Sequence, residues 1–230
     1  MNAKIPLLNK YPPSIKKLIQ SIQQKPPLSA ILLKGLLEEA NVCQDELHTY
    51  NEYCHPKEFS YGRNCIWEDD SFKMYVLSWN PGDFTAIHSH TNIDFGVVAF
   101  YGKAEHRTYD LANNHIRLIK NETIEKNSSV IINNSEFCHS MGNISEPSFL
   151  TLHIYGCFDE SELRKTKIVH IERNMITITD RAAFLNSPIL AHEENIFGIN
   201  SDSLLKKDYV NCTNSFFERI GKTDLLKELV

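Results

Sequence analysis

Residues 82–90 have the sequence Gly82-Asp83-Phe84-Thr85-Ala86-Ile87-His88-Ser89-His90, and this segment carries the most specific pattern in the chain. Residues i and i+2 of a β-strand point to the same face, so we expect the side chains of His88 and His90 to lie together. Two imidazoles on one face are a candidate pair of metal ligands, although two surface or hydrogen-bonded histidines would give the same pattern. The surrounding sequence decides between these interpretations.

From Tyr61 onward the hydrophobic pattern has a period of two, which is typical of strands with one buried face. Turn sequences such as Asn80-Pro81-Gly82-Asp83 and Asn113-Asn114 separate the short runs. The predicted strands span residues 72–79, 95–101, 103–109, 116–119, 129–132, 149–155, 168–171 and 175–178. Eight or more short strands at intervals of about 8–12 residues predict a β-sandwich or β-barrel.

Helical patterns flank this β region. A helical period follows Pro12-Pro13-Ser14, and a second one runs from Ile31 to Cys43. Residues 44–53 have a weaker helical composition, and residues 214–230 have an amphipathic helical pattern. We expect a main domain over residues 1–180, with its helical segment over 1–55, and a C-terminal extension over residues 181–230 that packs on the barrel.

The composition excludes several classes of protein. The 230 residues are 42% hydrophobic and 23% charged, which is typical of a globular chain rather than a disordered or collagenous one. The net charge of −5 argues against a nucleic-acid partner. Because no long apolar run or signal peptide is present and the six cysteines are scattered like reduced thiols, we expect a cytoplasmic monomer or homodimer without a membrane partner.

A third histidine extends the pattern around His88 and His90. Gly102 closes the first hairpin, and His139 and Asn143 follow at the spacing of a later one. Together these residues resemble the two cupin motifs, G-x5-H-x-H-x(3,4)-E-x6-G and H-x3-N. The resemblance implies a mainly β fold, a jelly-roll-like cupin β-barrel, which here carries N-terminal helices and a C-terminal helical tail.

The position of the cupin glutamate is occupied by Phe95, which cannot bind a metal. Asp94 is adjacent, but a shift of one residue turns a side chain to the opposite face of a strand unless a bulge intervenes. The favoured ligands are therefore His88, His90 and His139. Three imidazoles leave half an octahedron open, which suits a divalent first-row ion that binds further ligands, and zinc would also accept them.

Four clusters of residues resemble the cysteine dioxygenase type I family, in the same order and at nearly the same spacing. They are Tyr61-Gly62-Arg63-Asn64; Trp79 with Ile87-His88-Ser89-His90-Thr91-Asn92; His139 with Asn143-Ile144-Ser145-Glu146-Pro147; and Thr151-Leu152-His153-Ile154-Tyr155. The similarity covers roughly residues 14–180. It implies a non-haem Fe(II) enzyme that oxidises the small-molecule thiol L-cysteine with O2 to cysteine sulfinate.

The site residues that the resemblance implies fall into three groups. They are the iron ligands His88, His90 and His139; the substrate-binding residues Arg63 and Tyr61; and the catalytic relay Thr151, His153 and Tyr155. An arginine guanidinium is a natural partner for a buried carboxylate. Residues i, i+2 and i+4 of one strand share a face, so the relay residues can form a chain of hydrogen bonds towards the metal.

The chain departs from this family where the animal enzymes have a crosslinking cysteine, because it has Phe95 followed by Gly96. A bulky ring there would narrow the pocket, so a dioxygenase for another small thiol, such as 3-mercaptopropionate or cysteamine, is one alternative. A second is a non-catalytic ligand-binding cupin in which Phe95 fills the site. A third is an isomerase or decarboxylase of the carboxylate-ligand cupins, which would need Asp94 as a ligand.

Several features are left without a predicted role in the chemistry. His106, His115, His170 and His192 show no pairing at ligand spacing, and we interpret them as surface or structural residues. The tail over residues 181–230 could cover a sheet edge, form a dimer contact or close over the pocket, and no residue in it decides between these roles.

Overall fold

Two β-sheets form the body of the molecule in the computed structural model, which describes residues 8–25, 28–90, 93–133, 137–156 and 165–229. The smaller sheet has the strand order β1-β2-β10-β5-β8, and all its neighbouring strands are antiparallel. Its strands are β1 (Gly62–Glu68), β2 (Phe72–Trp79), β10 (Phe149–Gly156), β5 (Phe95–Phe100) and β8 (Ser129–Asn133).

The larger sheet has the order β13-β12-β11-β4-β9-β6-β7-β14, and β3 also pairs with β9. Its strands are β3 (Asp83–Phe84), β4 (Ile87–Ser89), β6 (Ala104–Ala112), β7 (His115–Ile124), β9 (Cys138–Asn143), β11 (Thr166–His170), β12 (Met175–Thr179), β13 (Glu194–Phe197) and β14 (Asn200–Ser201). The two sheets curve around an interior filled by aromatic and aliphatic side chains such as Trp79, Phe100 and Met141. The predicted β-barrel is thus confirmed.

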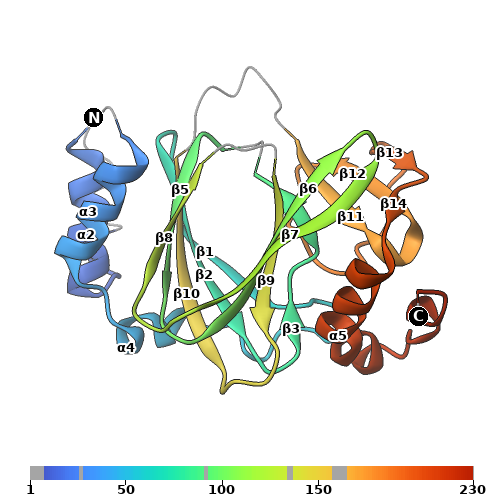
Figure 1. Cartoon of the computed structure of the whole chain (residues 1–230). Helices are drawn as coiled ribbons and strands as arrows, with labels where there is room; N and C mark the ends of the chain where they lie inside the picture. Colours follow the sequence, from blue (N-terminus) through green and yellow to red (C-terminus); the bar gives the residue numbers. More distant parts are fainter. Residues whose placement is uncertain (1–7, 26–27, 91–92, 134–136, 157–164, 230) are drawn as a thin grey trace.

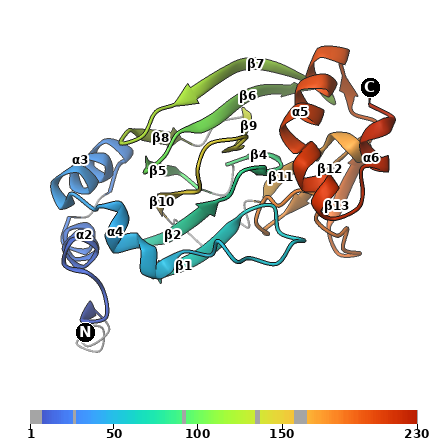
Figure 2. The same cartoon turned by 90° about the horizontal axis from the view of Figure 1, so that it is seen from below.

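Helices from the two ends of the chain lie on opposite sides of this body (Figure 1; Figure 2). On the N-terminal side are α2 (Pro13–Gln23), α3 (Ala30–Ala40), α4 (Gln44–Leu47) and the 3-10 turn η1 (His48–Tyr50). Ser29 caps α3 by accepting a hydrogen bond from the N–H of Leu32, at 3.2 Å, and Asn41 ends the helix in the left-handed conformation. Helix α3 packs on β5 and β8, and α2 packs on α3.

The C-terminal side differs from the sequence prediction. A helix was predicted over residues 214–230, but α5 (Ser203–Arg219) begins earlier because Asp202 accepts a hydrogen bond from the N–H of Leu205, at 2.7 Å. Gly221, at φ 70°, then separates α5 from the short α6 (Asp224–Lys227). The other 3-10 turn of the described chain is η2 (Ile171–Arg173).

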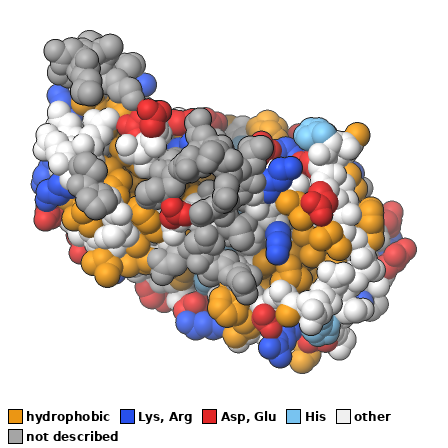
Figure 3. All heavy atoms as spheres, turned by 90° about the horizontal axis from the view of Figure 1, so that it is seen from above, with side chains coloured by type: hydrophobic (Ala, Val, Ile, Leu, Met, Phe, Trp, Pro, Cys, Tyr) orange, Lys and Arg blue, Asp and Glu red, His pale blue; other side chains and the backbone are white. Residues whose placement is uncertain are grey.

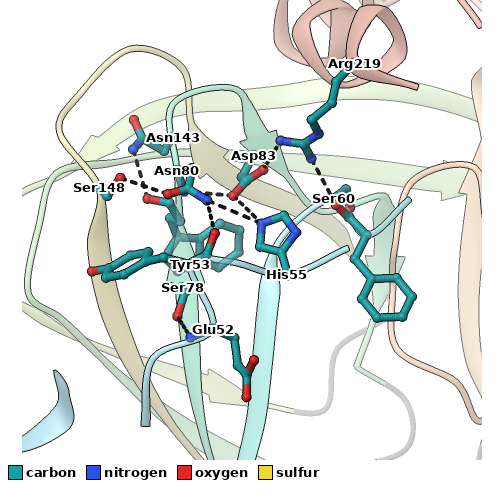
Figure 4. A network of polar contacts seen from close by, with 12 residues as sticks. Glu52, Tyr53, His55, Ser60, Ser78, Asn80, Asp83, Asn143, Ser148 and Arg219 are labelled. Atoms are coloured by element: carbon teal, nitrogen blue, oxygen red, sulfur yellow. Dashed lines mark hydrogen bonds and ion pairs between the residues drawn. The ribbon is translucent and has the colours of Figure 1, made fainter. Parts of the chain in front are cut away.

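A polar network joins α5 to Asp83, near the start of the segment 82–90 (Figure 4). Arg219 Nη1 donates to Asp83 Oδ1 at 2.8 Å, and the other carboxylate oxygen lies 3.0 Å from His55 Nε2. That second oxygen also accepts a hydrogen bond from the backbone N–H of Asn80, at 2.8 Å. Because Asp83 is fully buried, these partners replace the water that would otherwise solvate its carboxylate.

The described part of one face of the molecule is mixed in character. Seen from above, basic, acidic and hydrophobic side chains are interspersed (Figure 3). Within the described ranges, no helix combines the length and the apolar character needed to cross a bilayer.

Candidate metal centre and active site

The three predicted ligands converge at the junction of β4 and β9. His88 and His139 are direct partners across this antiparallel pair, so their side chains point to the same face, and His90 follows two residues after His88. His139 Nε2 lies 2.7 Å from His90 Nε2 and 3.2 Å from His88 Nε2. The structure therefore brings all three imidazoles together.

Burial holds these imidazoles in the neutral form. It lowers the pKa of His88 to about 4 and holds the pKa values of His90 and His139 well below their ordinary range. His88 Nδ1 lies 2.9 Å from the carbonyl oxygen of Ala86 and donates its hydrogen to it. The lone pair of His88 therefore lies on Nε2, which faces the other two rings.

The donor set fits a divalent metal ion. With metal–nitrogen distances of about 2.1 Å, nitrogen ligands at right angles lie about 3 Å apart, which is close to the separations here. Among the described residues, the group of side chains that could hold an ion is His88, His90 and His139. Asp94 lies outside it.

The predicted relay residues also lie in one line, on β10. Trp79 Nε1 donates to Thr151 Oγ1 at 2.9 Å, Thr151 Oγ1 lies 2.8 Å from His153 Nε2, and His153 Nδ1 lies 2.8 Å from the Tyr155 hydroxyl. The ring centroid of Tyr155 is 5.8 Å from that of His90. A continuous chain of polar groups therefore runs from Trp79 in the barrel interior to the hydroxyl of Tyr155, whose ring lies beside that of His90.

Burial also sets the protonation of this chain. It lowers the pKa of His153 to about 3, with a further contribution from the charge of Arg63, and it raises the pKa of Tyr155. At neutral pH His153 is therefore neutral, and Tyr155 keeps its hydroxyl hydrogen.

Arg63 and Tyr61 lie on the same side of the site. The Arg63 guanidinium stacks over the ring of Tyr75, 3.9 Å from its centroid, an arrangement that orients the charge. Tyr61 is buried between Trp79 and Phe184, with ring centroids 5.1 Å and 4.6 Å away. Its pKa is raised to about 12 by burial, so it remains a neutral hydroxyl.

A cavity of about 220 Å³ joins these groups. All three histidines, Arg63, Tyr61, His153 and Tyr155 line it. This volume lies below the range of about 300–1,000 Å³ typical of pockets for drug-sized ligands, so it suits a small substrate. Residues 180–183 also line it, which places the segment after β12 in the wall.

The position of Phe95 corrects one sequence-based expectation. The Phe95 ring does not narrow the cavity, because it packs in the apolar cluster beneath the N-terminal helices. Its neighbour Gly96 pairs with Tyr155 across β5 and β10, and a Cβ atom there would lie 2.6 Å from Tyr155 Cδ1. Gly96, one residue later than the motif spacing indicates, therefore faces the relay.

The sequence pattern does not predict one functional candidate, His106. His106, interpreted as a bystander, has its Nε2 3.0 Å from His139 Nδ1. The alternation of side chains over residues 104–108 indicates that His106 and Thr108 share a face of one strand. It does not indicate that this strand lies beside β9. His115 and His192 are exposed and His170 is buried next to Glu172, so these three are surface or structural residues as expected.

Comparisons with known proteins identify the family of the chain. The family model described as "Cysteine dioxygenase type I" matches residues 14–160, a range that includes every predicted site residue. Similar solved structures include the cupin domain of Schizosaccharomyces pombe Cnp3, at 13% identity over 43% of this chain and 66% of that one, with a TM-score of 0.36. An uncharacterised conserved protein with a double-stranded β-helix domain from Klebsiella pneumoniae subsp. pneumoniae has 14% identity over 54% of this chain and 93% of that one, with a TM-score of 0.40.

Proposed function

Since the chain belongs to the cysteine dioxygenase type I family, we propose that it is a non-haem Fe(II) dioxygenase that oxidises L-cysteine with O2 to cysteine sulfinate. The family and the two-sheet barrel identify the fold as a cupin, as the sequence predicted. Family membership by itself indicates a thiol dioxygenase-like oxidoreductase. The observation that carries the finer proposal is the convergence of three neutral imidazoles in a small cavity that also contains Arg63 and Tyr155.

In this proposal His88, His90 and His139 hold the iron through their Nε2 atoms. Bound Fe(II) would lower the pKa of the substrate thiol and activate O2. Arg63 binds the substrate carboxylate, and its stacking on Tyr75 supports this role because a guanidinium fixed in orientation loses less entropy on binding. Tyr61 supports the same wall through its stacking on Trp79 and Phe184.

The relay on β10 would control a hydrogen bond at the sulfur. Trp79 can only donate, so Thr151 accepts from it and can donate in turn to His153 Nε2. In this order His153 Nδ1–H donates to the Tyr155 oxygen, and the phenol is the donor at the cavity end. There it would donate to the oxygen atoms as they are added to sulfur.

The overall reaction balances without another reductant. The S–H bond of the thiol breaks and its hydrogen leaves as a proton, while both atoms of O2 form bonds to sulfur. Sulfur loses four electrons, and these reduce O2. The product is one sulfinate for each O2 consumed.

The substrate's carboxylate separates the candidate thiols. L-cysteine and 3-mercaptopropionate both carry a carboxylate, whereas cysteamine does not. The ring of Phe95 lies away from the cavity, so it gives no reason to prefer a thiol other than cysteine. For the same reason it does not favour a non-catalytic ligand-binding cupin.

Oxygen uptake by protein loaded anaerobically with Fe(II) tests the proposal. We expect L-cysteine to give uptake and an equal amount of sulfinate by mass spectrometry. Arg63→Ala should lower kcat/KM for carboxylate-bearing thiols by about 10–100-fold and affect cysteamine little. The exposed Arg117 offers a matched control, Arg117→Ala. The absence of uptake with all three thiols would contradict the proposal.

Metal analysis of the purified protein tests the metal. We expect iron in a ratio of one per chain in the wild type and its loss in His139→Ala. An Asp94→Ala variant should keep its metal, because Asp94 lies outside the ligand group. Stoichiometric zinc that supports no turnover would count against an iron enzyme.

We also propose a cytoplasmic location. It is supported by the cysteines of the described chain, Cys43, Cys54, Cys65, Cys138 and Cys212, which are free thiols; Cys157 lies outside the described residues. The monomer or homodimer and the division of the chain after residue 180 stay predictions. The pairing of β13 with β12 is what an extension packed on the barrel would produce.

A further inference from the structure

Four neighbouring strands of the larger sheet place polar side chains in one row. The strands are β4, β9, β6 and β7, in that order. His88 is the direct partner of His139, and Thr108 on β6 is the partner of His139 on its other side. His106 precedes Thr108 by two residues, so it lies on the same face, diagonal to His139. On β7 the direct partner of His106 is Glu122.

The side chains in this row are in contact. His106 Nε2 lies 3.0 Å from His139 Nδ1, and His106 Nδ1 lies 3.3 Å from Glu122 Oε1. The His106 side chain is 17% exposed, whereas that of Glu122 is 35% exposed and also contacts Lys120 Nζ at 2.7 Å. The row therefore starts at the edge of the solvent and ends at the candidate metal centre.

The chemistry of a metal ligand fixes the hydrogens along the row. If His139 binds a metal through Nε2, its hydrogen must be on Nδ1, and it points at His106 Nε2. His106 must then accept at Nε2 and carry its own hydrogen on Nδ1, which points at the Glu122 carboxylate. Each of the two imidazoles can make these contacts in only one tautomer, and the Glu122 carboxylate at the far end favours that tautomer of His106.

We propose that His106 is a positioning residue for the metal ligand His139, and that Glu122 completes the chain. The inference rests on the proposed metal site. His106 accepts the hydrogen of His139 Nδ1, which fixes the orientation of the ligand ring and increases the electron density on Nε2. Glu122 fixes the orientation of His106 in the same way, with its charge reduced by Lys120.

This arrangement differs from the support of the neighbouring ligand. His88 donates its Nδ1 hydrogen to the carbonyl of Ala86, a backbone group that no side-chain substitution removes. His139 depends on a side chain for the same function. The proposal therefore predicts that the site can be weakened by substitution on β6, a strand that contributes none of the three ligands.

Metal titration with three variants tests the role. His106→Leu keeps an apolar group of similar reach but removes the acceptor, whereas His106→Gln places an amide oxygen near the former Nε2. We measure the dissociation constant for Co(II), as a probe for Fe(II), together with the Co(II) absorption spectrum. The melting temperature of the metal-free protein reports separately on folding. Glu122→Gln removes the charge at the far end, and the exposed His115→Leu on β7 is the matched control.

We expect His106→Leu to raise the Co(II) dissociation constant by about 10–100-fold and to alter the spectrum. His106→Gln should bind more tightly than His106→Leu, and His115→Leu should bind like the wild type. If His106→Leu is folded and binds Co(II) as tightly as the wild type, the inference is wrong. It is equally wrong if His106→Gln is as weak as His106→Leu, because the accepted hydrogen bond then contributes nothing.

Two further outcomes remain decisive. If His106→Leu does not fold, unchanged Co(II) binding in both His106→Gln and Glu122→Gln overturns the inference, and weaker binding in Glu122→Gln supports it. If the wild type binds neither Co(II) nor Fe(II), the proposed function fails, a result distinct from a wild type that binds metal and variants that do not differ from it.

Discussion

The two sheets of the barrel carry different parts of the candidate site, and different forces hold them in place. The smaller sheet carries the relay on β10, and apolar side chains of α2 and α3 cover its outer face, Ile15, Ile19 and Leu33 among them. The larger sheet carries the three histidines. Helix α5 covers it with apolar side chains such as Phe216 and Phe217, but it also makes several buried or part-buried polar contacts.

These polar contacts tie α5 to three separate parts of the larger sheet and its connections. Arg107 Nε on β6 donates to Asp208 at 2.7 Å, Tyr209 donates to Glu172 at 2.6 Å, and Arg219 donates to Asp83 at 2.8 Å. On β6, Arg107 directly follows His106, so the same strand contacts α5 on one face and a candidate metal ligand on the other. The outer side of the relay sheet is thus supported by packing and by neutral hydrogen bonds, such as those that the hydroxyls of Tyr11 and Tyr101 donate to the carbonyls of Ile66 and Val42, whereas the metal strands depend partly on charges. Removing one member of each kind of contact tests this difference.

The largest effect on stability is expected beneath the relay. Leu33 is fully buried between α3 and the smaller sheet, and Leu33→Ala should lower the free energy of unfolding by about 3–5 kcal/mol, since it leaves a cavity. The loss should be similar at pH 6 and pH 9, because no charge is involved. Urea denaturation measures it, with the 76% exposed Leu204→Ala as the control. A loss below about 1 kcal/mol would mean that packing does not hold this side.

A comparable but charge-dependent loss is expected on the other sheet. Arg219→Met should lower the free energy of unfolding by about 3 kcal/mol, because it removes a partner of the fully buried Asp83 carboxylate. The loss stays at the lower end of the range for broken buried pairs, since His55 and the N–H of Asn80 remain. Arg117→Met, at an exposed pair, is the control and should change stability by less than about 1 kcal/mol. Equal losses in the two variants would show that the buried ion pair contributes no more to stability than the exposed one.

A substitution beside the relay should affect activity more than stability. Gly96→Ala puts a Cβ atom 2.6 Å from Tyr155 Cδ1, so the ring must move, and we expect kcat with cysteine to fall by an order of 10²-fold. Gly35→Ala adds the same methyl group where nothing lies within 4 Å, so it should leave activity unchanged. Steady-state kinetics of the iron-loaded protein decides. Full activity of Gly96→Ala would remove Tyr155 from the proposed chemistry.

The smallest effect concerns pH. The hydrogen bond to the Asp83 carboxylate raises the pKa of His55 above its ordinary value of 6.5. The stabilisation from this pair is therefore complete below about pH 6.5 and is lost as the pH rises through the raised pKa. Unfolding midpoints between pH 6 and pH 9 should fall less in His55→Gln than in the wild type. An identical fall in both proteins would rule out this pair as the cause.

Much of the candidate site is predictable from the sequence because it depends on strand alternation. The pairs His88 with His90 and His153 with Tyr155 need only one strand each, and the structure confirms that each pair shares a face. The position of His139 beside them follows from the spacing of the motif that carries it. Local periodicity is sufficient wherever the functional residues lie on one strand.

The features that escaped prediction depend on contacts between strands. The motif spacing assigned the slot beside Tyr155 to Phe95, but Gly96 occupies it, and an error of one residue reverses the face. The role of His106 depends on β6 lying next to β9, which the order of strands along the chain does not reveal. The start of α5 depends on one cap at Asp202, in a region with a weak hydrophobic pattern.

The ion pair between α5 and the barrel also has a consequence for folding during synthesis on the ribosome. Asp83 and Arg219 are 136 residues apart, so the pair forms only after the residues between them and Arg219 itself have been synthesised. When Asp83 has just been synthesised, two of its partners, His55 and the N–H of Asn80, are already present in the chain. The helix that supplies the arginine is not. The β4–β9 junction, whose histidines are 51 residues apart, can pair well before that. Helix α5 therefore completes the partners of Asp83 after the β4–β9 junction can form, and a chain truncated before α5 would leave the buried carboxylate without its arginine.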